Sequence, residues 1–576
     1  MIEINSNSLI EIDKPFKVFA GPGAGKTFWL INHTKNVLRN SKKLSSTAKI
    51  ACITYTNIGV DEIQKRLENN GDRVYVSTIH NFLYKFIVKP YAFLLKDNEG
   101  NYIINLKNLD GHDEHIPNNK FIFKWKSLNN IGYIKEDERI YECLQNLDWS
   151  LNETNELDLN PRDIWRKKVG KYSIKSDYFY SYKQLYWHNG QIHHEDVLYF
   201  SYRIITEHPE IIKFIHLKFP YIFIDEFQDT NPLQTQIIKK IANSGTIIGV
   251  IGDSEQSIYK FQGAKRQDFL DFDLPNLEIY QINGNRRSTK AIIKLLDNLR
   301  NDKIAQTSIR QIEGVSPTIY SDNRLQVIQK LQISHPDLVI LSRKNETVGQ
   351  IKNSNNRVLG DLWTISRNLD SNFDRQRLLY NAIYAAELCL LGNYKDAARI
   401  ASKIFYKFSN GNKINDTKKK ELAISIIDYL ISHKNNNLSK TILEFHNTLF
   451  ENLSRNYQVT VGAKISKGAF KDFAQEKTYA NLVQSLRIKD DTSNIKTIHK
   501  AKGAEFNNVL VVFDSSDELK YILESQKHQI DDDSRIYYVA FSRARDNLFL
   551  HVNEPISIEN MNKLMLFGIK EGILTK

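Results

Sequence analysis

Short apolar runs alternate with helical patterns over the first half of the chain. Near the N-terminus, an apolar run from Val18 to Ala20 meets a glycine-rich turn, after which a helical pattern begins. Strand-like runs recur in the segments KIACITYTN, VYVSTIHNF, FPYIFIDEFQD and GTIIGVIGD. Strands that alternate with helices in this way predict a parallel sheet with helices on its faces. This part of the chain therefore predicts an α/β domain.

The same alternation returns later and predicts a second α/β domain. LEIYQINGNRRS opens it, and PDLVILSRKNE, NIKTIHKAKGAEFNNVLVVF and RIYYVAFSRARDNLFLHV continue it. Two stretches break the pattern: one is polar and aromatic with short helical patterns, and the other is helical and rich in lysine and asparagine. We therefore predict a first α/β domain at 1–89 and 184–280, an insertion at 90–183, a second α/β domain at 281–349 and 490–576, and a helical insertion at 350–489.

Composition narrows the class of protein. Hydrophobic residues make up 41% and charged residues 25% of the 576 residues, which excludes a mainly disordered chain. The three cysteines, Cys52, Cys143 and Cys389, lie far apart, so neither a disulfide framework nor a cysteine-based metal cluster is indicated. No apolar run reaches the roughly 18 residues of a membrane helix, and no export signal precedes the first strand. We therefore expect a cytoplasmic protein that does not enter a membrane.

The net charge favours an acidic binding partner but does not by itself establish one. Lysine and arginine total 79 against 67 aspartates and glutamates, a formal charge of +12. Such an excess favours nucleic acid as the first candidate partner. It is modest for a chain of this length, and many basic proteins bind nothing acidic. The motifs must therefore carry the functional prediction.

The glycine-rich turn AGPGAGKT has the pattern of a phosphate-binding loop. Glycines let backbone N–H groups turn toward phosphate oxygens, a lysine reaches the β- and γ-phosphates, and a threonine hydroxyl ligates Mg²⁺. The alternative is a glycine turn that only caps a helix, but the strand before and the helix after favour the phosphate loop. The predicted nucleotide-binding residues are Ala20, Gly21, Pro22, Gly23, Ala24, Gly25, Lys26 and Thr27.

Two carboxylates follow a buried strand further along the chain. The apolar residues Tyr221 to Ile224 run directly into Asp225 and Glu226, at the strand end where open α/β sheets bind their ligands. Asp225 would hold Mg²⁺ together with Thr27, and Glu226 would polarise the attacking water as a general base. Such a pair alone is common at solvated strand ends. Together with the phosphate loop it predicts a nucleotide triphosphatase.

Five motifs in a fixed order identify the kind of triphosphatase. They are DEFQD, GDSEQSIYKFQGA, NGNRRST, TIHKAKGAEF and YVAFSRA, and their order resembles that of superfamily 1 helicases of the UvrD/Rep/PcrA type. The resemblance covers both α/β domains and leaves the insertions unmatched in detail. It implies two RecA-like P-loop NTPase domains, each with a mainly helical insertion. It also implies ATP with Mg²⁺ as cofactors and ATP-dependent helicase activity on single-stranded or tailed DNA, 3′ to 5′.

The resemblance also implies roles for residues around the nucleotide. Gln228 and Gln256 would sense the γ-phosphate and couple it to DNA contacts, and Glu505 would hydrogen-bond the ribose. Arg287 and Arg543 would neutralise charge on the transferred phosphoryl group, an effect worth on the order of 10³ to 10⁵ in rate. An isolated arginine is more often part of a surface ion pair, but here the motifs favour catalysis.

Contacts to a DNA strand follow from the same resemblance. Aromatic faces stack on bases without reading sequence, at roughly 1 to 3 kcal/mol each, which suits a motor that moves along any sequence. Core packing is the alternative function of such rings and stays open for Tyr55 and Phe261. The predicted DNA-binding residues are Thr54, Tyr55, Thr56, Asn57, His80, Tyr259, Phe261, Thr497 and His499.

Three positions depart from the family pattern. Residues 1–19 contain no glutamine, whereas family members usually carry one that reads the adenine edge, so adenine specificity stays open. Arg286 stands where a tyrosine often stacks on adenine, and its planar guanidinium can also stack on a base. Gln262 stands where an arginine is frequent, which would weaken a strand contact.

The segment HNGQIHHEDV raises the alternative of a metal site. It brings His188, His193, His194, Glu195 and Asp196 close together in sequence. HHED precedes a helical pattern that leads to the DEFQD strand, however, and the family resemblance implies packing and capping residues there. We therefore predict that these residues cap and pack that helix.

Two other functions remain to be compared with a helicase. The first is a DNA-sensing regulatory ATPase that signals to a protein partner, such as a nuclease or a repair or defence subunit. Compact helicases of this type occur in bacterial antiphage systems such as Gabija, which the chain resembles in architecture only. The second is a non-motor P-loop enzyme such as a kinase, which would not need Arg287, Glu505 and Arg543 in these motifs.

Overall fold

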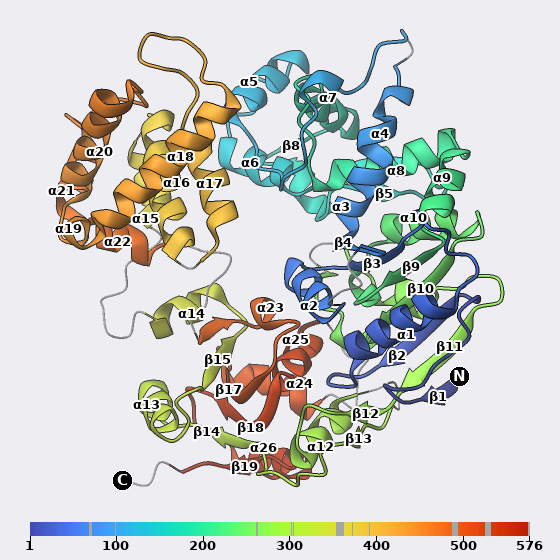
Figure 1. Cartoon of the computed structure of the whole chain (residues 1–576). Coiled ribbons are helices and arrows are strands. Elements are labelled where there is room, and N and C mark those ends of the chain that lie inside the picture. Colours follow the sequence, from blue (N-terminus) through green and yellow to red (C-terminus); the bar gives the residue numbers. More distant parts are fainter. Residues whose placement is uncertain are drawn as a thin grey trace. The chain divides into compact units, whose positions relative to one another are not determined.

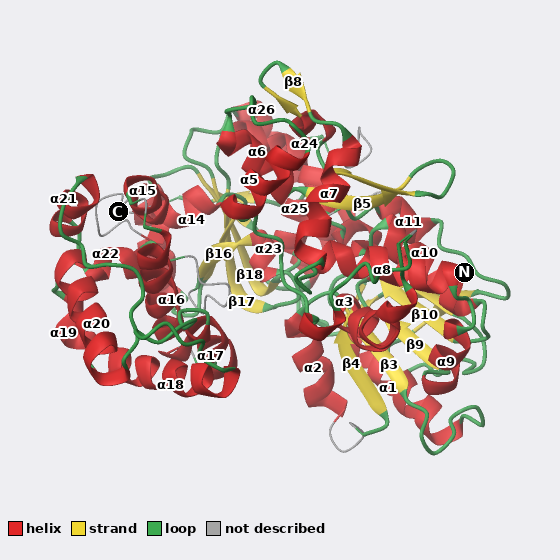
Figure 2. Cartoon of the chain, turned by 90° about the horizontal axis from the view of Figure 1, so that it is seen from above, coloured by secondary structure: helices red, strands yellow, loops and turns green. Residues whose placement is uncertain are grey.

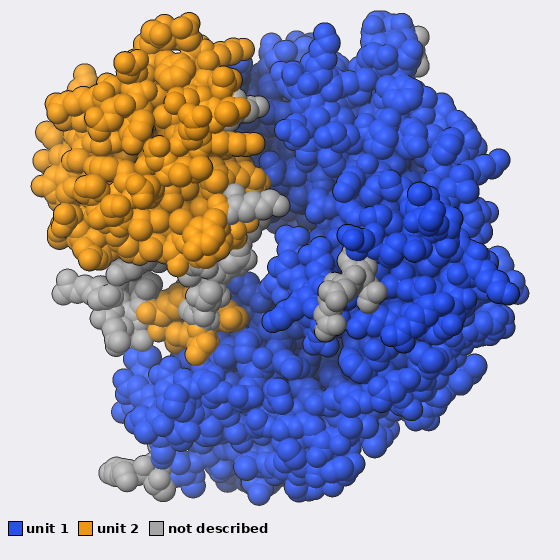
Figure 3. Space-filling view, viewed as in Figure 1, with its two compact units in different colours: residues 1–343, 497–576 blue, residues 344–496 orange. Residues whose placement is uncertain are grey.

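The chain folds into two compact units. The computed structural model describes residues 1–67, 72–97, 99–260, 263–300, 302, 304–352, 362–370, 372–390, 392–486, 494–524 and 532–573. One unit comprises 1–343 with 497–576, and the other comprises 344–496 (Figures 1 and 3). Two large sheets lie in the first unit, apart from residues 495–496 of the second sheet, and the second unit is built mainly from helices.

The first sheet has seven strands, and every neighbouring pair is parallel. In spatial order the strands are β1 (Ile2–Ile4), β11 (Glu278–Ile282), β2 (Phe16–Ala20), β10 (Ile247–Gly252), β9 (Tyr221–Ile224), β3 (Ile50–Thr54) and β4 (Val74–Thr78). Because the strands are parallel, the residues that follow β2, β3, β9 and β10 all lie at one edge of the sheet.

Alternation of side chains along β9 explains why helices cover both faces. Tyr221 and Phe223 pack with Trp29 in one core, whereas Ile222 and Ile224 pack in a second core on the other face. The first core is covered by α1 (Lys26–Asn40) and α2 (Asn57–Leu67). The second is covered by α3 (Ile79–Leu83), α8 (His194–Glu207), α9 (Ile211–Lys218), α10 (Pro232–Ala242) and α11 (Arg266–Leu270).

The segment expected as the first insertion contains hairpins that the sequence did not predict. Its helices are α4 (Lys89–Tyr91), α5 (Asn119–Leu128), α6 (Asp137–Gln145) and α7 (Ser176–Trp187), and α7 continues past the expected boundary at 183. Two antiparallel pairs accompany them, and Figure 2 labels one strand of each, β5 and β8: β5 (Leu147–Leu151) pairs with β6 (Leu157–Pro161), and β7 (Lys168–Val169) pairs with β8 (Tyr172–Ser173). Strands of two to five residues are too short for their periodicity to distinguish them from loops.

The second sheet has six strands, and LEIYQI does not open it as expected. Instead β11 pairs in parallel with β1 and β2 of the first sheet. In spatial order the second sheet contains β16 (Ile495–Thr497), β15 (Val339–Ser342), β17 (Phe506–Val512), β18 (Ala544–His551), β14 (Thr318–Tyr320) and β19 (Lys570–Glu571). Its core includes residues of α12 (Lys290–Leu299), α23 (Ile498–Ala501), α24 (Lys520–Leu523), α25 (Asp532–Phe541) and α26 (Ile558–Leu566).

Three further elements complete the first unit: α13 (Arg324–Ser334), and the short strands β12 (Gly284–Asn285) and β13 (Thr307–Ser308), which pair with each other.

The second unit has a hydrophobic core of its own. Its helices are α14 (Asn345–Lys352), α15 (Leu362–Leu369), α16 (Phe373–Leu390), α17 (Tyr394–Ser402), α18 (Asp416–Ser432), α19 (Lys434–Leu438), α20 (Ile442–Tyr457), α21 (Ala469–Glu476) and α22 (Tyr479–Gln484). Of the helices that the structure describes, none combines the length and apolar character needed to cross a membrane.

Candidate functional site

The glycine loop joins β2 to α1 and approaches the second α/β domain closely. Gly23 and Gly25 have φ angles of 69° and 83°, a left-handed region that glycine enters without strain. A Cβ at Gly23 would lie only 2.6 Å from Asn285 Oδ1, because β12 lies directly against the loop. Lys26 Nζ donates to the carbonyl oxygen of Ala20 at 3.3 Å. The loop thus presents a buried ammonium group beside backbone that can turn toward an anion.

Two carboxylates at the end of β9 face this loop. Thr27 Oγ1 donates to Asp225 Oδ2 at 3.1 Å, so a hydroxyl and a carboxylate oxygen converge. Burial and then the charge of Glu226 raise the pKa of Asp225. Burial also acts to raise the pKa of Glu226, but the charges of Lys26 and Lys502 outweigh it and hold that pKa below its usual range. The site therefore favours the ionised form of Glu226.

Side-chain amides connect Glu226 to the second α/β domain. Gln228 Nε2 donates to Glu226 Oε2, and its Oε1 accepts from the Asp253 backbone N–H at 3.0 Å. Gln256 Nε2 donates to Asp253 Oδ2 at 2.7 Å, and its Oε1 accepts from Arg543 Nη2 at 2.7 Å. A continuous hydrogen-bonded chain therefore runs from the first sheet to an arginine beside the second.

The two predicted arginines lie next to each other. Arg543 is buried, and burial together with the charge of Arg287 lowers its pKa to about 9. Arg287 Nε donates to Glu505 Oε2 at 2.8 Å, and its Nη1 donates to the Ser542 carbonyl at 2.8 Å. Two cations held together in this way favour an anion beside them. Glu505, expected at a ribose, pairs with Arg287 here.

Arg286 lies beside the glycine loop. Its backbone N–H donates to the Gly23 carbonyl at 2.8 Å, and its Nε donates to Ser6 Oγ at 2.9 Å. Ser6 is buried, and a Cβ at Gly25 would lie 3.3 Å from Ser6 Cβ. Arg286 and Ser6 are therefore polar groups that the chain offers beside the phosphate loop.

Lys502 is a site residue that was not predicted. Its ammonium donates to the Gln256 carbonyl at 2.7 Å and to Asp229 Oδ2, and it lies 4.8 Å from the centre of the Tyr259 ring. Both Lys502 and Asp229 lie within quoted motifs, TIHKAKGAEF and DEFQD. The motif positions were the available signal, but only the fold shows that the two side chains meet.

Arg300 is a second residue that sequence reasoning missed. Buried at the end of α12, it contacts both oxygens of Asp253, at 3.0 and 3.2 Å, and donates to the Tyr538 hydroxyl at 2.7 Å. It also pairs with Asp302. Arg300 therefore orients Asp253, which in turn holds Gln256. No motif marks it, because it is a single arginine after a helix.

Four of the predicted DNA-contact residues lie between the end of β3 and the start of α2. Thr54 ends β3 and is buried, and Asn57 begins α2. The Tyr55 ring stacks on that of Tyr259, with centres 5.0 Å apart and planes 30° apart. Thr56 Oγ1 accepts from the Gly59 N–H at 3.1 Å. Tyr259 is only 9% exposed, so much of its surface packs in the second core.

The remaining predicted strand residues are more scattered. His499 lies 6.2 Å from Tyr259, ring centre to ring centre, and Thr497 directly precedes α23. His80 lies in α3 beside His194, and burial, followed by the charges of neighbouring histidines, lowers its pKa to about 3. Phe261 and Gln262 lie outside the described residues.

The histidine-rich segment caps and packs α8, as predicted. At its first turn, the Asp196 carboxylate accepts from the backbone N–H of the N-cap residue His193 at 2.9 Å. His115, His193 and Glu195 come close enough together to suggest a metal site. The buried Lys183 ammonium lies among them, however, and contacts Glu195, Asp196 and His193 Nδ1. The Lys183 ammonium therefore supplies the positive charge that a metal ion would otherwise bring to this cluster.

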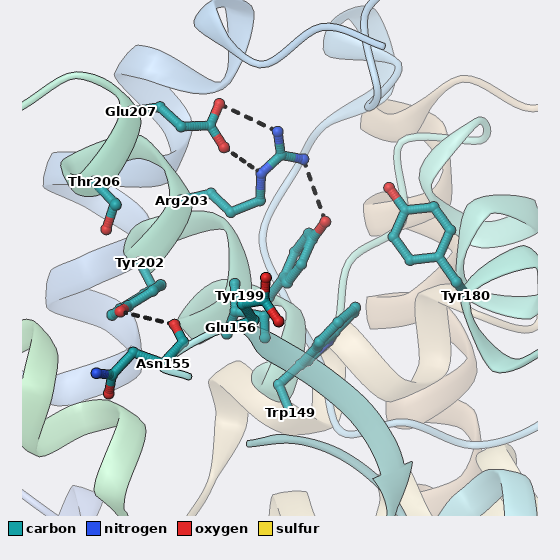
Figure 4. A pocket seen from close by; sticks show the side chains of 10 residues that line it. Trp149, Asn155, Glu156, Tyr180, Tyr199, Tyr202, Arg203, Thr206 and Glu207 are labelled. Atoms are coloured by element: carbon teal, nitrogen blue, oxygen red, sulfur yellow. Dashed lines mark hydrogen bonds and ion pairs between the residues drawn. The ribbon is translucent and has the colours of Figure 1, made fainter. Parts of the chain in front are cut away.

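A separate pocket of about 350 Å³ lies beside β5, α7 and α8 (Figure 4). Trp149 and Tyr199 stack with ring centres 3.9 Å apart, and Arg203 pairs with Glu207 and donates to the Tyr199 hydroxyl. None of the predicted nucleotide-binding or DNA-binding residues lines this pocket. The pairing of its charged groups gives no reason to place the nucleotide there.

The fold and the site together define a class of protein. Two parallel sheets, a phosphate loop with paired carboxylates, and two arginines from the second α/β domain are the arrangement of a two-domain P-loop triphosphatase. The α/β architecture expected from the sequence is confirmed.

Comparison with known proteins identifies the family. The UvrD/REP helicase N-terminal domain matches residues 3–275, and the UvrD-like helicase C-terminal domain matches 285–555. A probable DNA helicase II homolog of Mycoplasma capricolum is 23% identical over 94% of this chain and 83% of its own length. ATP-dependent DNA helicase PcrA of Bacillus subtilis is 25% identical over 93% and 80%. Gabija protein GajB of Bacillus cereus is 29% identical over 52% of this chain and 49% of GajB.

The chain belongs to the UvrD/REP family of DNA helicases, a family of DNA-dependent ATPases. The resemblance drawn from the ordered motifs is thereby confirmed.

Proposed function

We propose that the protein is an ATP-dependent helicase or translocase that moves along single-stranded DNA from 3′ to 5′. The observation that carries the proposal is the hydrogen-bonded chain from Glu226 through Gln228, Asp253 and Gln256 to Arg543. It joins the proposed general base to an arginine of the second α/β domain. Family membership supports DNA-dependent ATP hydrolysis, and the direction is the one that the family resemblance implies.

The residues at the glycine loop fit ATP and Mg²⁺. Thr27 Oγ1 and Asp225 Oδ2 lie 3.1 Å apart and are the oxygen ligands that Mg²⁺ prefers. When bound there, Mg²⁺ neutralises charge on the phosphates. Lys26 binds phosphate oxygens, and the ionised Glu226 accepts the proton of the attacking water. Arg287 and Arg543 bind the phosphoryl group as its charge develops.

Lys502 supplies a connection between phosphate and strand. Gln256 binds Arg543 through its side chain and Lys502 through its backbone carbonyl, while Lys502 lies over Tyr259. A change at the γ-phosphate that moves Gln256 therefore acts on Lys502 and Tyr259 together. This coupling is what a translocase requires, because grip on the strand must alternate with hydrolysis.

The first test is ATP hydrolysis by purified protein with and without single-stranded DNA. We expect DNA to stimulate hydrolysis, and we expect displacement of a labelled strand from a 3′-tailed duplex but not from a 5′-tailed one. Absence of stimulation by any DNA would overturn the proposal. Displacement from the 5′-tailed duplex alone would overturn only the direction.

The strand contact is tested at Tyr55. We expect Tyr55→Ala to weaken binding of single-stranded oligonucleotide by the loss of one stacked base, roughly 1 to 3 kcal/mol or about 5- to 150-fold in Kd. Tyr55→Trp should restore binding because it keeps a flat aromatic face. Tyr102→Ala removes an exposed tyrosine elsewhere and serves as the matched control. Anisotropy titrations measure all three; equal affinities would assign Tyr55 to core packing.

A second candidate function is a DNA-sensing ATPase that acts through a protein partner in the cytoplasm, in repair or in phage defence. The similarity to Gabija protein GajB, 29% identical over 52% of this chain, favours considering it. Strong DNA-stimulated hydrolysis without strand displacement would support the sensor over the helicase.

A further inference from the structure

The segment from Arg162 to Lys175, which follows β6, is rich in basic residues. It contains six lysines and arginines and one aspartate. The segment forms a 3₁₀ turn at Ile164–Lys167, followed by the β7–β8 pair, and we call residues 162–175 the basic hairpin. In Figure 2, β8 stands at the margin of the view, beyond α5 and α6.

The charges of the basic hairpin are only partly neutralised within the protein. Arg166 pairs with Asp163 and Glu142. By contrast, the side chains of three lysines are exposed, and none of them forms an ion pair with a residue that the structure describes: Lys168, Lys171 and Lys175. Uncompensated, exposed ammonium groups close together in one short segment favour a polyanion over a protein of mixed charge.

Two large apolar side chains are exposed among these basic residues. Ile164 is 72% exposed and Trp165 is 67% exposed, and the Arg166 guanidinium lies 4.6 Å from the Trp165 ring. The other five tryptophans of the chain are buried: Trp29, Trp125, Trp149, Trp187 and Trp363. An exposed indole beside lysines combines a stacking surface for a base with contacts for phosphates.

The basic hairpin begins beside the proposed strand contacts. Arg162 pairs with Asp148 at 2.9 Å, and a Cβ at Gly263, in the motif that contains Tyr259, would lie 3.4 Å from Asp148 Oδ2. The Arg162 charge also opposes the burial that raises the pKa of Tyr55. The same charge contributes to lowering the pKa of His80. Trp165 is three residues from Arg162, a reach of at most about 10 Å along an extended chain. A strand held at Tyr55 would therefore meet Trp165 within a few nucleotides.

We propose that the basic hairpin is a second DNA-binding site, in which Lys168, Lys171 and Lys175 bind phosphates and Trp165 stacks on an unpaired base of the strand that continues past Tyr55. The inference rests on the proposed function in that its ligand is DNA. It adds a contact in a segment that carries none of the nucleotide or strand motifs. The site is sequence-tolerant, since indole faces and phosphates do not distinguish bases.

The single exposed tryptophan provides a direct test. Acrylamide quenching of the intrinsic fluorescence of the full chain should act mainly on Trp165, and Trp165→Phe should remove most of the quenchable signal. Saturation with a 20-nucleotide oligo-dT, verified by anisotropy, should protect the wild-type indole from acrylamide. Binding of the oligonucleotide without protection would overturn this inference and leave the proposed function standing. Failure of the oligonucleotide to bind at all would overturn both.

Charge reversal supplies a second readout. For Lys168→Glu with Lys171→Glu, the slope of log affinity against log salt should fall by about 1.4, because single-stranded DNA contributes roughly 0.7 per phosphate contact. Lys42→Glu changes another exposed lysine, just past the end of α1 that lies away from the phosphate loop; it is the control and should leave the slope unchanged. The inference is wrong if the double variant and the control bind DNA alike.

Discussion

Glu226→Gln is expected to reduce DNA-stimulated ATP hydrolysis by roughly 10²- to 10⁴-fold, the usual contribution of a general base. Glutamine has nearly the same shape, so the contact with Gln228 can persist, but its amide cannot accept a proton from water at neutral pH. The charges of Lys26 and Lys502 hold the pKa of Glu226 low despite burial, which keeps the carboxylate ionised in the native protein. ATP binding through Lys26 and Thr27 should survive.

Two measurements separate chemistry from binding in this variant. Single-turnover hydrolysis reports the chemical step, and titration with a fluorescent ATP analogue reports affinity. Glu138→Gln, an exposed glutamate in α6, is the control and should behave as wild type. Hydrolysis by Glu226→Gln at the wild-type rate would mean that another group activates the water.

Lys183→Met is expected to destabilise the first unit by about 3 to 5 kcal/mol, the cost of leaving buried charge uncompensated. The Lys183 ammonium is fully buried and contacts both Glu195 and Asp196. Methionine matches its length but removes the charge, so two carboxylates would remain in the interior. In the native protein, burial acts to raise the pKa of Asp196, but Lys183 and His193 outweigh burial and hold that pKa below its ordinary value.

Urea unfolding followed by tryptophan fluorescence measures this effect, since Trp149 and Trp187 lie in the same core. Lys120→Met replaces an exposed lysine of α5 and should change stability little. The triple variant Lys183→Met, Glu195→Gln, Asp196→Asn should recover part of the loss, because the unpaired charges are gone. If Lys183→Met is as stable as wild type, the cluster does not depend on the lysine charge.

Most of the site prediction depended on short local sequence motifs. The phosphate loop and the Asp225–Glu226 pair each depend on a few consecutive residues between a strand and a helix, so their structural context could be read from the sequence. The contacts of Arg300 with Asp253 and of Lys502 with Asp229 join residues 47 and 273 positions apart. Such pairs depend on tertiary packing, and no local periodicity reports them.

The fold prediction likewise succeeded where local sequence patterns decide the structure and failed where pairing between distant segments decides it. Strong strand-helix alternation predicted two α/β domains, whereas the placement of β11 in the first sheet depends on its pairing with β1 and β2. The alternating pattern of β11 is the same in either sheet, so the sequence alone could not assign it. The hairpins β5–β6 and β7–β8 were missed because their strands are short.

The close approach of β12 to the glycine loop bears on how nucleotide enters and leaves. Asn285 lies where a side chain at position 23 would stand, and the Arg286 N–H is bonded to the loop itself. A nucleotide bound at the loop would be covered on that side by a segment of the opposite α/β domain. Release of ADP on that side would require the β12 segment to move away from the loop. The turnover rate would then depend on how readily the two sheets separate as well as on the rate of the chemical step.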